Sequence, residues 1–302
     1  MNKEYLGTLL AILTAVVSGI SIPLNKIFVV DLDPLIFTAV RGLIIGLVFL
    51  VLTIVQKNRL KKPMKQVSWK YLLAIAVIGG SLAFAMFFSG LQLTTSGRGA
   101  FLHKTLPLFA TLFAFIFLKE KIPKKQLYAL LAMFAGLVIM TVSQIEPGLL
   151  WSNPQVGDFL IIGATILWAL ENTIARKAMI EGEHNFIVAF SRMFIGGLIL
   201  FGIVGVFGRF DALIALTSSQ WANILVSSGI LFCYVFFWYW SIKLINVSKA
   251  SMLLLLAPVI SLIAGMSWLG EPLPMLQLAG SALILIGACF VVGIKSRLST
   301  GV

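Results

Sequence analysis

The segment LKEKIP at residues 118–123 recurs as LGEPLP at residues 269–274, an offset of 151 positions. Both copies have glutamate at the third position and proline at the sixth. The same offset aligns further residues at both ends of each half without a gap. These pairs are Lys26 with Lys177, Arg41 with Arg192, Gly46 with Gly197, Pro107 with Pro258 and Gly136 with Gly287. The chain is therefore an internal duplication.

The composition indicates that the duplicated unit lies in lipid. Of the 302 residues, 60% are hydrophobic and only 11% are charged, whereas soluble domains keep about a quarter of their residues charged. Such a chain cannot cover itself with polar surface in water. The net charge of +12 does not indicate nucleic acid, because the lysines and arginines gather in short gaps between apolar runs.

Ten apolar runs are long enough to cross a bilayer, which takes about 20 residues. Turn-forming pairs such as Asp33-Pro34 and Asn153-Pro154 separate them. We therefore predict an all-α integral membrane protein of ten transmembrane helices. The spans are Tyr5–Val29, Leu35–Val55, Tyr71–Leu93, Ser96–Leu118, Gln126–Val142, Val156–Ala178, Phe186–Phe207, Trp221–Leu244, Ala250–Leu269 and Leu276–Ile294.

Each half holds five spans, and two copies of an odd-span unit must cross the membrane in opposite directions. We predict an inverted repeat with a first unit at residues 1–145 and a second at 152–298. Inverted repeats recur in secondary transporters, whose substrate sites lie near the midplane between the repeats. A duplicated bundle without a transport role is the alternative.

Positive charge alternates between successive gaps, with Arg98 and Arg209 as the main exceptions. The rule that cytoplasmic loops are positive then places both termini in the cytoplasm, and we expect the protein in the plasma (inner) membrane.

Several motifs lie at corresponding places in the two halves. They are Leu106-Pro107-Leu108-Phe109, Phe117-Leu118-Lys119-Glu120, Ser248-Lys249-Ala250-Ser251, Ala257-Pro258-Val259-Ile260 and Leu269-Gly270-Glu271-Pro272. This pattern resembles the EamA domain of the drug/metabolite transporter superfamily, present twice. The resemblance implies efflux or exchange of small solutes such as amino acids. The sequence departs from the usual pattern at His103 and Lys104, whose counterparts are Leu254 and Leu255.

Polar residues on two repeat-related spans predict a central cavity. Ser21 and Asn25 share one face of the first span, and Trp168, Glu171 and Asn172 mark a polar face of the sixth. Ser21 and Asn172 match under the offset. The alternative is helix packing, because small polar side chains also hold membrane helices together.

Five ionisable residues lie inside the spans, and each costs about 3 kcal/mol or more in hydrocarbon. They are Arg41, His103, Lys104, Glu171 and Arg192. Glu171 and Arg192 both lie about 10 Å from the cytoplasmic face at 1.5 Å per residue. We expect them to meet, either as a structural ion pair or as a site of proton coupling.

Lys104 is too deep to reach water easily, so its side chain should face the cavity. With Arg41 and His103 nearby, the positive balance predicts an anionic or zwitterionic substrate. The amine of an amino acid would then lie toward Glu171. The alternative is that Lys104 pairs with Asp31 or Asp33.

Three further residues are candidates by position. Trp238 shares a face of the eighth span with Tyr234 and could contact a substrate. Pro107 and Pro258 should kink spans four and nine, because proline removes a helical hydrogen bond.

We find no phosphate-binding loop, metal-ligand spacing or nucleophile motif, and we expect no cofactor and no enzymatic activity. Two other functions stay open: an intramembrane enzyme on a lipid-linked substrate, with His103 and Glu171 as acid and base, and a non-transporting partner subunit. The sequence does not indicate an oligomeric state.

The charge alternation predicts that the loop Gln56–Lys70 is cytoplasmic. A cysteine introduced between Ser143 and Pro154 should react with an impermeant thiol reagent added outside intact cells. Labelling only after permeabilisation would overturn this orientation.

Overall fold

The structure is a computed structural model that describes residues 2–28, 32–56, 66–143, 154–269 and 274–296. These residues form helices joined by turns, with no strand among them. The first half comprises α1 (Lys3–Phe28), α2 (Pro34–Val55), α3 (Trp69–Val77), η3 (Ile78–Leu82), α4 (Ala83–Gln92), α5 (Ser96–His103), α6 (Leu106–Phe117) and α7 (Lys124–Val142). The second comprises α9 (Val156–Ile180), α10 (Asn185–Phe190), η4 (Ser191–Ile195), α11 (Gly196–Val206), α12 (Asp211–Ile214), α13 (Ser218–Leu244), α14 (Val247–Leu253), α15 (Leu256–Leu269) and α16 (Met275–Gly293).

The described residues contain ten helical segments long and apolar enough to span a membrane, so the predicted architecture is confirmed. Four of these spans are divided, whereas from the sequence we expected a distortion in only two of them, at Pro107 in span four and Pro258 in span nine. Spans three and seven each contain a π-helical turn, η3 and η4. Spans four and nine are each interrupted, between α5 and α6 and between α14 and α15.

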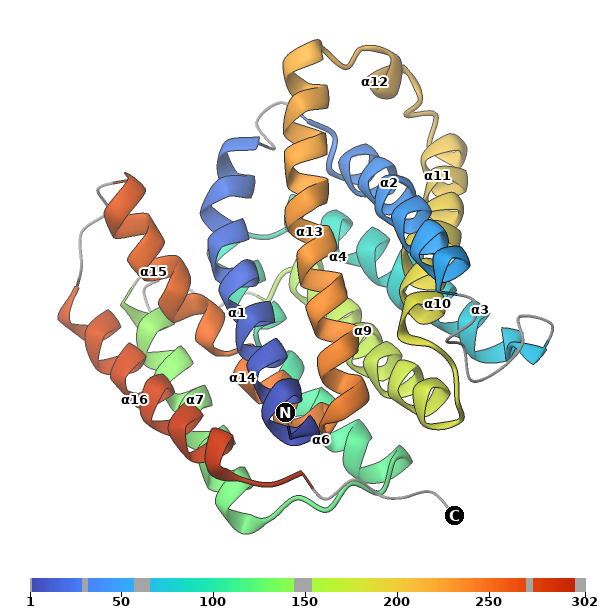
Figure 1. Cartoon of the computed structure of the whole chain (residues 1–302). Helices are drawn as coiled ribbons and strands as arrows, with labels where there is room; N and C mark the ends of the chain where they lie inside the picture. Colours follow the sequence, from blue (N-terminus) through green and yellow to red (C-terminus); the bar gives the residue numbers. More distant parts are fainter. Residues whose placement is uncertain (1, 29–31, 57–65, 144–153, 270–273, 297–302) are drawn as a thin grey trace.

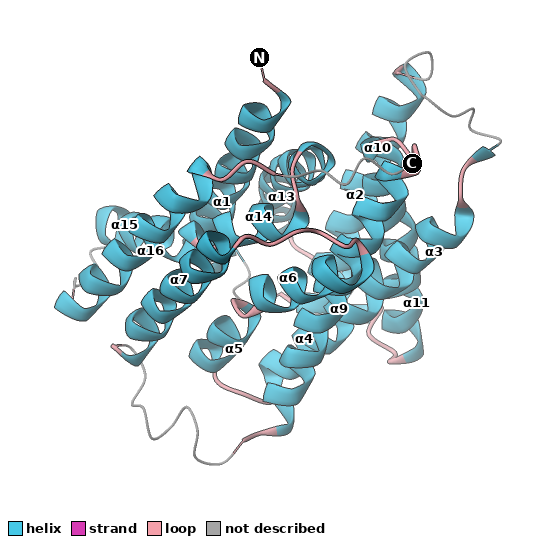
Figure 2. Ribbon diagram, turned by 90° about the horizontal axis from the view of Figure 1, so that it is seen from below, coloured by secondary structure: helices cyan, strands magenta, loops and turns pink. Residues whose placement is uncertain are grey.

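Helix packing follows the duplication. The bounds of α7 and α16 differ by the offset at both ends, and the two helices lie against each other (Figure 1). Helix α1 packs on α13 and α15, while its repeat counterpart α9 packs on α4 and α6. Under the offset, α13 corresponds to the span that contains α4, and α15 corresponds to α6. The helices that pack on α1 are therefore the repeat counterparts of those that pack on α9. This exchange is what an inverted repeat of five spans requires, and Figure 2 shows the same bundle from below.

The first and last described segments meet at one end of the bundle. The Lys249 ammonium lies 2.7 Å from the Glu4 carboxylate, which also accepts a 3.0 Å hydrogen bond from the backbone N–H of Ser296. Helix α12 lies at the opposite end (Figure 1). Both ends of the described chain therefore lie on the same side of the bundle, which an even number of spans demands.

The glutamate of the LKEKIP segment joins the two halves. Glu120 accepts hydrogen bonds from the backbone N–H groups of Val247 at 2.9 Å and Ser248 at 3.2 Å, and from the Ser248 hydroxyl at 2.6 Å. It thereby satisfies free N–H groups at the start of α14 and places negative charge at that helix N-terminus. Gln126 donates to the same hydroxyl at 3.1 Å. The counterpart Glu271 lies outside the described residues.

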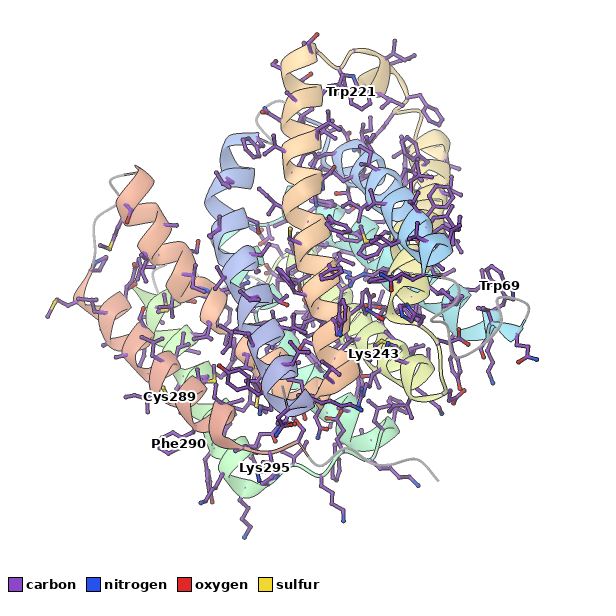
Figure 3. All side chains as sticks on the ribbon, in the orientation of Figure 1. Trp69, Trp221, Lys243, Cys289, Phe290 and Lys295 are labelled. Carbon is purple, nitrogen blue, oxygen red and sulfur yellow. The ribbon has the colours of Figure 1, made fainter. Side chains whose placement is uncertain are left out.

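The outer surface of the bundle is apolar, as lipid requires. Figure 3 shows Trp69 and Phe290 pointing away from the helices, and these side chains are 55% and 64% exposed. The two arginines that broke the charge alternation are neutralised locally. Arg98 pairs with Asp158, and Arg209 lies 3.1 Å from Asp33.

The two π-helical turns pack against each other through glycine. A Cβ atom added at Gly80 would lie 2.1 Å from the carbonyl oxygen of Arg192 and 2.9 Å from the Cα of Gly196. One added at Gly79 would lie 2.3 Å from Cγ of Glu171. Only hydrogen fits at these points, so the glycines let η3 approach the helices that carry Glu171 and Arg192.

Gly80→Ala should therefore destabilise the protein by about 1–3 kcal/mol, the usual cost of overpacking. Gly202→Ala is a matched control, because a Cβ there meets no atom within 4 Å. Alanine at position 202 should be neutral or stabilising, by up to about 1 kcal/mol, from helix propensity. Thermal unfolding in detergent measures both. Equal melting temperatures for the two variants would contradict this account of the contact.

Candidate functional site

The interrupted helices place two repeat-related turns in the middle of the bundle. Helix α5 ends at His103 and α6 begins at Leu106, so Lys104 lies in the intervening turn. In the other repeat α14 ends at Leu253 and α15 begins at Leu256. A proline follows each break by a few residues. Its ring excludes the carbonyl four residues earlier and it has no N–H to donate, so a continuous helix is disfavoured there.

A cavity of about 230 Å³ lies at these turns. It is smaller than the roughly 300–1,000 Å³ of sites for drug-sized ligands, and it suits one small metabolite. Its described lining consists of Ser18, Ser21, Arg41, Phe84, Phe87, Phe88, His103, Lys104, Leu106, Pro107, Trp168, Asn172, Arg192, Met193, Ser227, Ile230, Leu231, Tyr234, Val235, Trp238, Leu254 and Leu255.

Much of this lining consists of residues related by the 151-residue offset. The pairs are Ser21 with Asn172, Arg41 with Arg192, Phe84 with Val235, Phe87 with Trp238, His103 with Leu254 and Lys104 with Leu255. The cavity therefore lies where the two repeats face each other. Substrate sites of inverted-repeat transporters occupy this position. The last two pairs break the symmetry, since a basic pair faces the cavity from one repeat and two leucines from the other.

Lys104 has no hydrogen-bond or ion-pair partner among the described residues, and its side chain faces the cavity. The alternative partner Asp33 lies elsewhere: it caps α2 by accepting from the N–H groups of Leu35 and Ile36, and it pairs with Arg209. Asp31 lies outside the described residues. No described side chain therefore offsets the charge of this ammonium group.

The neighbouring His103 lies between aromatic rings. Its ring centroid is 5.0 Å from that of Trp168 and 5.2 Å from that of Phe87. Its Nδ1 is buried without a hydrogen-bond partner in the described structure. The imidazole therefore contributes both an aromatic face and one unused polar atom to the cavity wall.

Arg41 and its counterpart Arg192 have different partners. Arg41 donates to the Ser227 hydroxyl at 2.8 Å and lies 4.3 Å from the centroid of the Phe37 ring. Its Nε atom is buried without a partner in the described structure. Arg192 lies 3.4 Å from the carboxylate of Glu171. The position that would give Arg41 the same partner is Ile20, so the charge of Arg41 is not offset in this way.

Glu171, which we expected among the cavity side chains, lies behind them and is fully buried. Its carboxylate accepts a 2.6 Å hydrogen bond from the Tyr239 hydroxyl and faces Arg192. Tyr239 is a residue of this cluster that we did not predict from the sequence. Because Glu171 is occupied in this cluster, the amine of a substrate in the cavity has no direct contact with it.

Two tryptophans present ring surface to the cavity while their polar atoms are satisfied. Trp168 donates to the carbonyl of Gly79 at 3.0 Å, and Trp238 donates to the side-chain oxygen of Asn172 at 2.8 Å. These bonds fix both ring orientations. The Asn172 oxygen thus already accepts one hydrogen bond from the protein.

The remaining site predictions have separate outcomes. Ser21 lies in the lining, whereas the side chain of Asn25 is outside the described part of the structure. Ser227 is a site residue that we missed. It extends the stripe of Leu231, Tyr234 and Trp238 on α13 at spacings of four, three and four, and this periodicity could have identified it.

These features define a multi-pass membrane protein with a solute-sized cavity between two inverted repeats. The EamA-like transporter family model matches residues 5–142 and 155–293. The chain belongs to this family, and the match contains the repeat twice. The precise unit limits of 1–145 and 152–298 stay a prediction.

Relatives and a solved structure agree with this assignment. An uncharacterized transporter of Archaeoglobus fulgidus is 26% identical over 93% of this chain and 96% of its own length. The uncharacterized transporter YvbV of Bacillus subtilis is 26% identical over 96% and 92%. One crystal structure matches with a TM-score of 0.76 at 18% identity, covering 95% of this chain and 98% of that chain. That likeness concerns the fold alone.

The pair formed by Glu171 and Arg192 can be tested by a double-mutant cycle. If Glu171 is structural, Glu171→Gln and Arg192→Gln should each cost about 3–5 kcal/mol, because each leaves a buried charge unpaired. The double variant should recover much of this loss. Glu181→Gln on the exposed end of the same helix is the control. Normal folding of Glu171→Gln with loss of the pH dependence of transport would instead indicate proton coupling.

Proposed function

We propose that this protein is a secondary transporter that exports or exchanges small anionic or zwitterionic metabolites, with amino acids among the candidates. A solute would bind in the cavity between the repeats and reach either side of the membrane by alternating access. We place the protein in the plasma (inner) membrane with both termini in the cytoplasm, from the charge pattern of its loops.

One observation carries this proposal: at the position where the two repeats meet, Lys104 faces the cavity with no partner among the residues that the structure describes. Membrane interiors tolerate an ionisable residue when it has a partner or a function. A transported anion would provide the missing partner for part of each cycle. The surrounding rings of Phe84, Phe87 and Trp168 would contact the apolar part of the solute.

The geometry gives less support to the enzyme alternative. It required His103 and Glu171 to act on one substrate as acid and base. His103 lines the cavity, whereas Glu171 is buried behind it and bonded to Tyr239. The acid and base named by this alternative therefore do not face the same cavity.

The direct test is solute flux into liposomes that contain the purified protein. A panel of organic acids, amino acids and phosphorylated solutes should include at least one transported species. For that species, Lys104→Met should lower affinity at least about tenfold, since an anion would lose its charged partner. Lys104→Arg should retain most of the affinity, and Lys295→Met at an exposed position is the matched control.

Absence of flux for every panel member would reject transport of these solute classes. Formation of a chemical product would favour the enzyme alternative. Unchanged affinity in a folded Lys104→Met protein would show that the lysine does not recognise the solute.

A further inference from the structure

The described lining of the cavity carries more positive than negative charge, and this excess favours some ligands over others. The basic side chains in the described lining are Arg41, His103, Lys104 and Arg192. No aspartate or glutamate occurs among the lining residues that the structure describes. The carboxylate of Glu171, which lies behind the lining, offsets Arg192 and accepts a hydrogen bond from the Tyr239 hydroxyl. Arg41 and Lys104 thus face the cavity without a carboxylate contact.

The positive charges of Arg41 and Lys104 would repel a ligand that carries an ammonium group. Two unit charges attract or repel strongly when the intervening medium is poor in water. The oxygen atoms of Asn172 and Ser21 in the lining are neutral acceptors, and the Asn172 oxygen already accepts one hydrogen bond from Trp238. A neutral acceptor does not offset the charge of an ammonium group as a carboxylate would. An ammonium group would therefore lose water without gaining a charged acceptor.

Much of the remaining lining fits an apolar group. Leu254 and Leu255 occupy the positions that correspond to His103 and Lys104. The aromatic rings of Phe84 and Trp168 meet edge to face at 5.1 Å, and Phe87 lies 5.3 Å from Trp168. The cavity therefore offers both positive charge and hydrocarbon surface to a ligand.

We propose that the preferred ligand is a small organic anion with an apolar or aromatic body and no ammonium group. A 2-oxo acid has this chemistry, whereas the matching amino acid does not. This inference rests on the proposed function and narrows its substrate class, because it favours anions over zwitterions. The carboxylate would contact Lys104 and Arg41, and the hydrocarbon part would lie against Leu254, Leu255 and the rings.

Matched ligands test the inference directly. Thermal stabilisation of the purified protein would be titrated with 4-methyl-2-oxopentanoate against leucine, and with phenylpyruvate against phenylalanine. Each pair differs at one carbon, and a specific ligand raises the melting temperature by mass action. At least one 2-oxo acid should bind about tenfold more tightly than its amino acid, or better. Equal or tighter binding of the amino acid in both pairs overturns the inference, and so does failure of both 2-oxo acids to bind.

A pair of variants at the leucine wall adds a control for charge. Leu255→Glu supplies the missing carboxylate and should reduce the preference for the 2-oxo acid, whereas Leu255→Gln has nearly the same shape and should keep it. An unchanged preference in a folded Leu255→Glu protein counts against the charge mechanism. The liposome assay distinguishes failure of this inference from failure of the proposed transport function. Flux of amino acids with no preference for 2-oxo acids would reject the inference about the substrate class but would still support transport.

Discussion

Inside a membrane every polar group must find its partner within the protein, and this constraint organises the whole chain. It explains why the described residues form helices and why ring nitrogens, hydroxyls and carboxylates in the bundle are nearly all bonded. Glu120 at the start of α14 and Trp168 at the carbonyl of Gly79 are two such cases. The exceptions are consequently informative. Buried polar atoms without a hydrogen-bond partner in the described structure occur at several places, and those of Arg41, His103 and Arg192 belong to residues that line the cavity. Lys104, which faces the same cavity, also has no partner among the described residues.

The duplication gives the bundle its framework, and departures from the duplication give the cavity its chemistry. The paired arginines show this most clearly. Arg192 has Glu171 as a neighbour, whereas the corresponding neighbour of Arg41 would be Ile20. Likewise Lys104 corresponds to Leu255. Two copies with identical side chains would present the same charge from both repeats. The observed substitutions leave Arg41 and Lys104 in the first repeat without the glutamate that offsets Arg192 in the second.

The ten transmembrane helices could be predicted from the sequence, because a long apolar run in a chain of this composition is almost always a transmembrane helix. The sequence also identified most of the polar cavity residues, since a lysine or arginine in hydrocarbon is rare enough to stand out. The sequence was not sufficient to predict which of two neighbouring residues on a helix faces the cavity, because this depends on the orientation of the helix about its axis. Glu171 and Asn172 are adjacent in sequence, yet only Asn172 reaches the cavity. The π-helical turns were also missed, because a single extra residue in a helix leaves hydropathy almost unchanged.

That extra residue has a consequence for the cavity walls. A π-helical turn accommodates one more residue than the α-helical turn it replaces, so everything beyond it is rotated by about 100° relative to an uninterrupted helix. Phe84, Phe87 and Phe88 all follow η3 in span three, and all three face the cavity. The aromatic lining thus depends on a change of phase upstream. A family member that lacked one residue between positions 78 and 82 would keep its transmembrane helix. Its aromatic side chains would then point to a different face of that helix, away from the cavity.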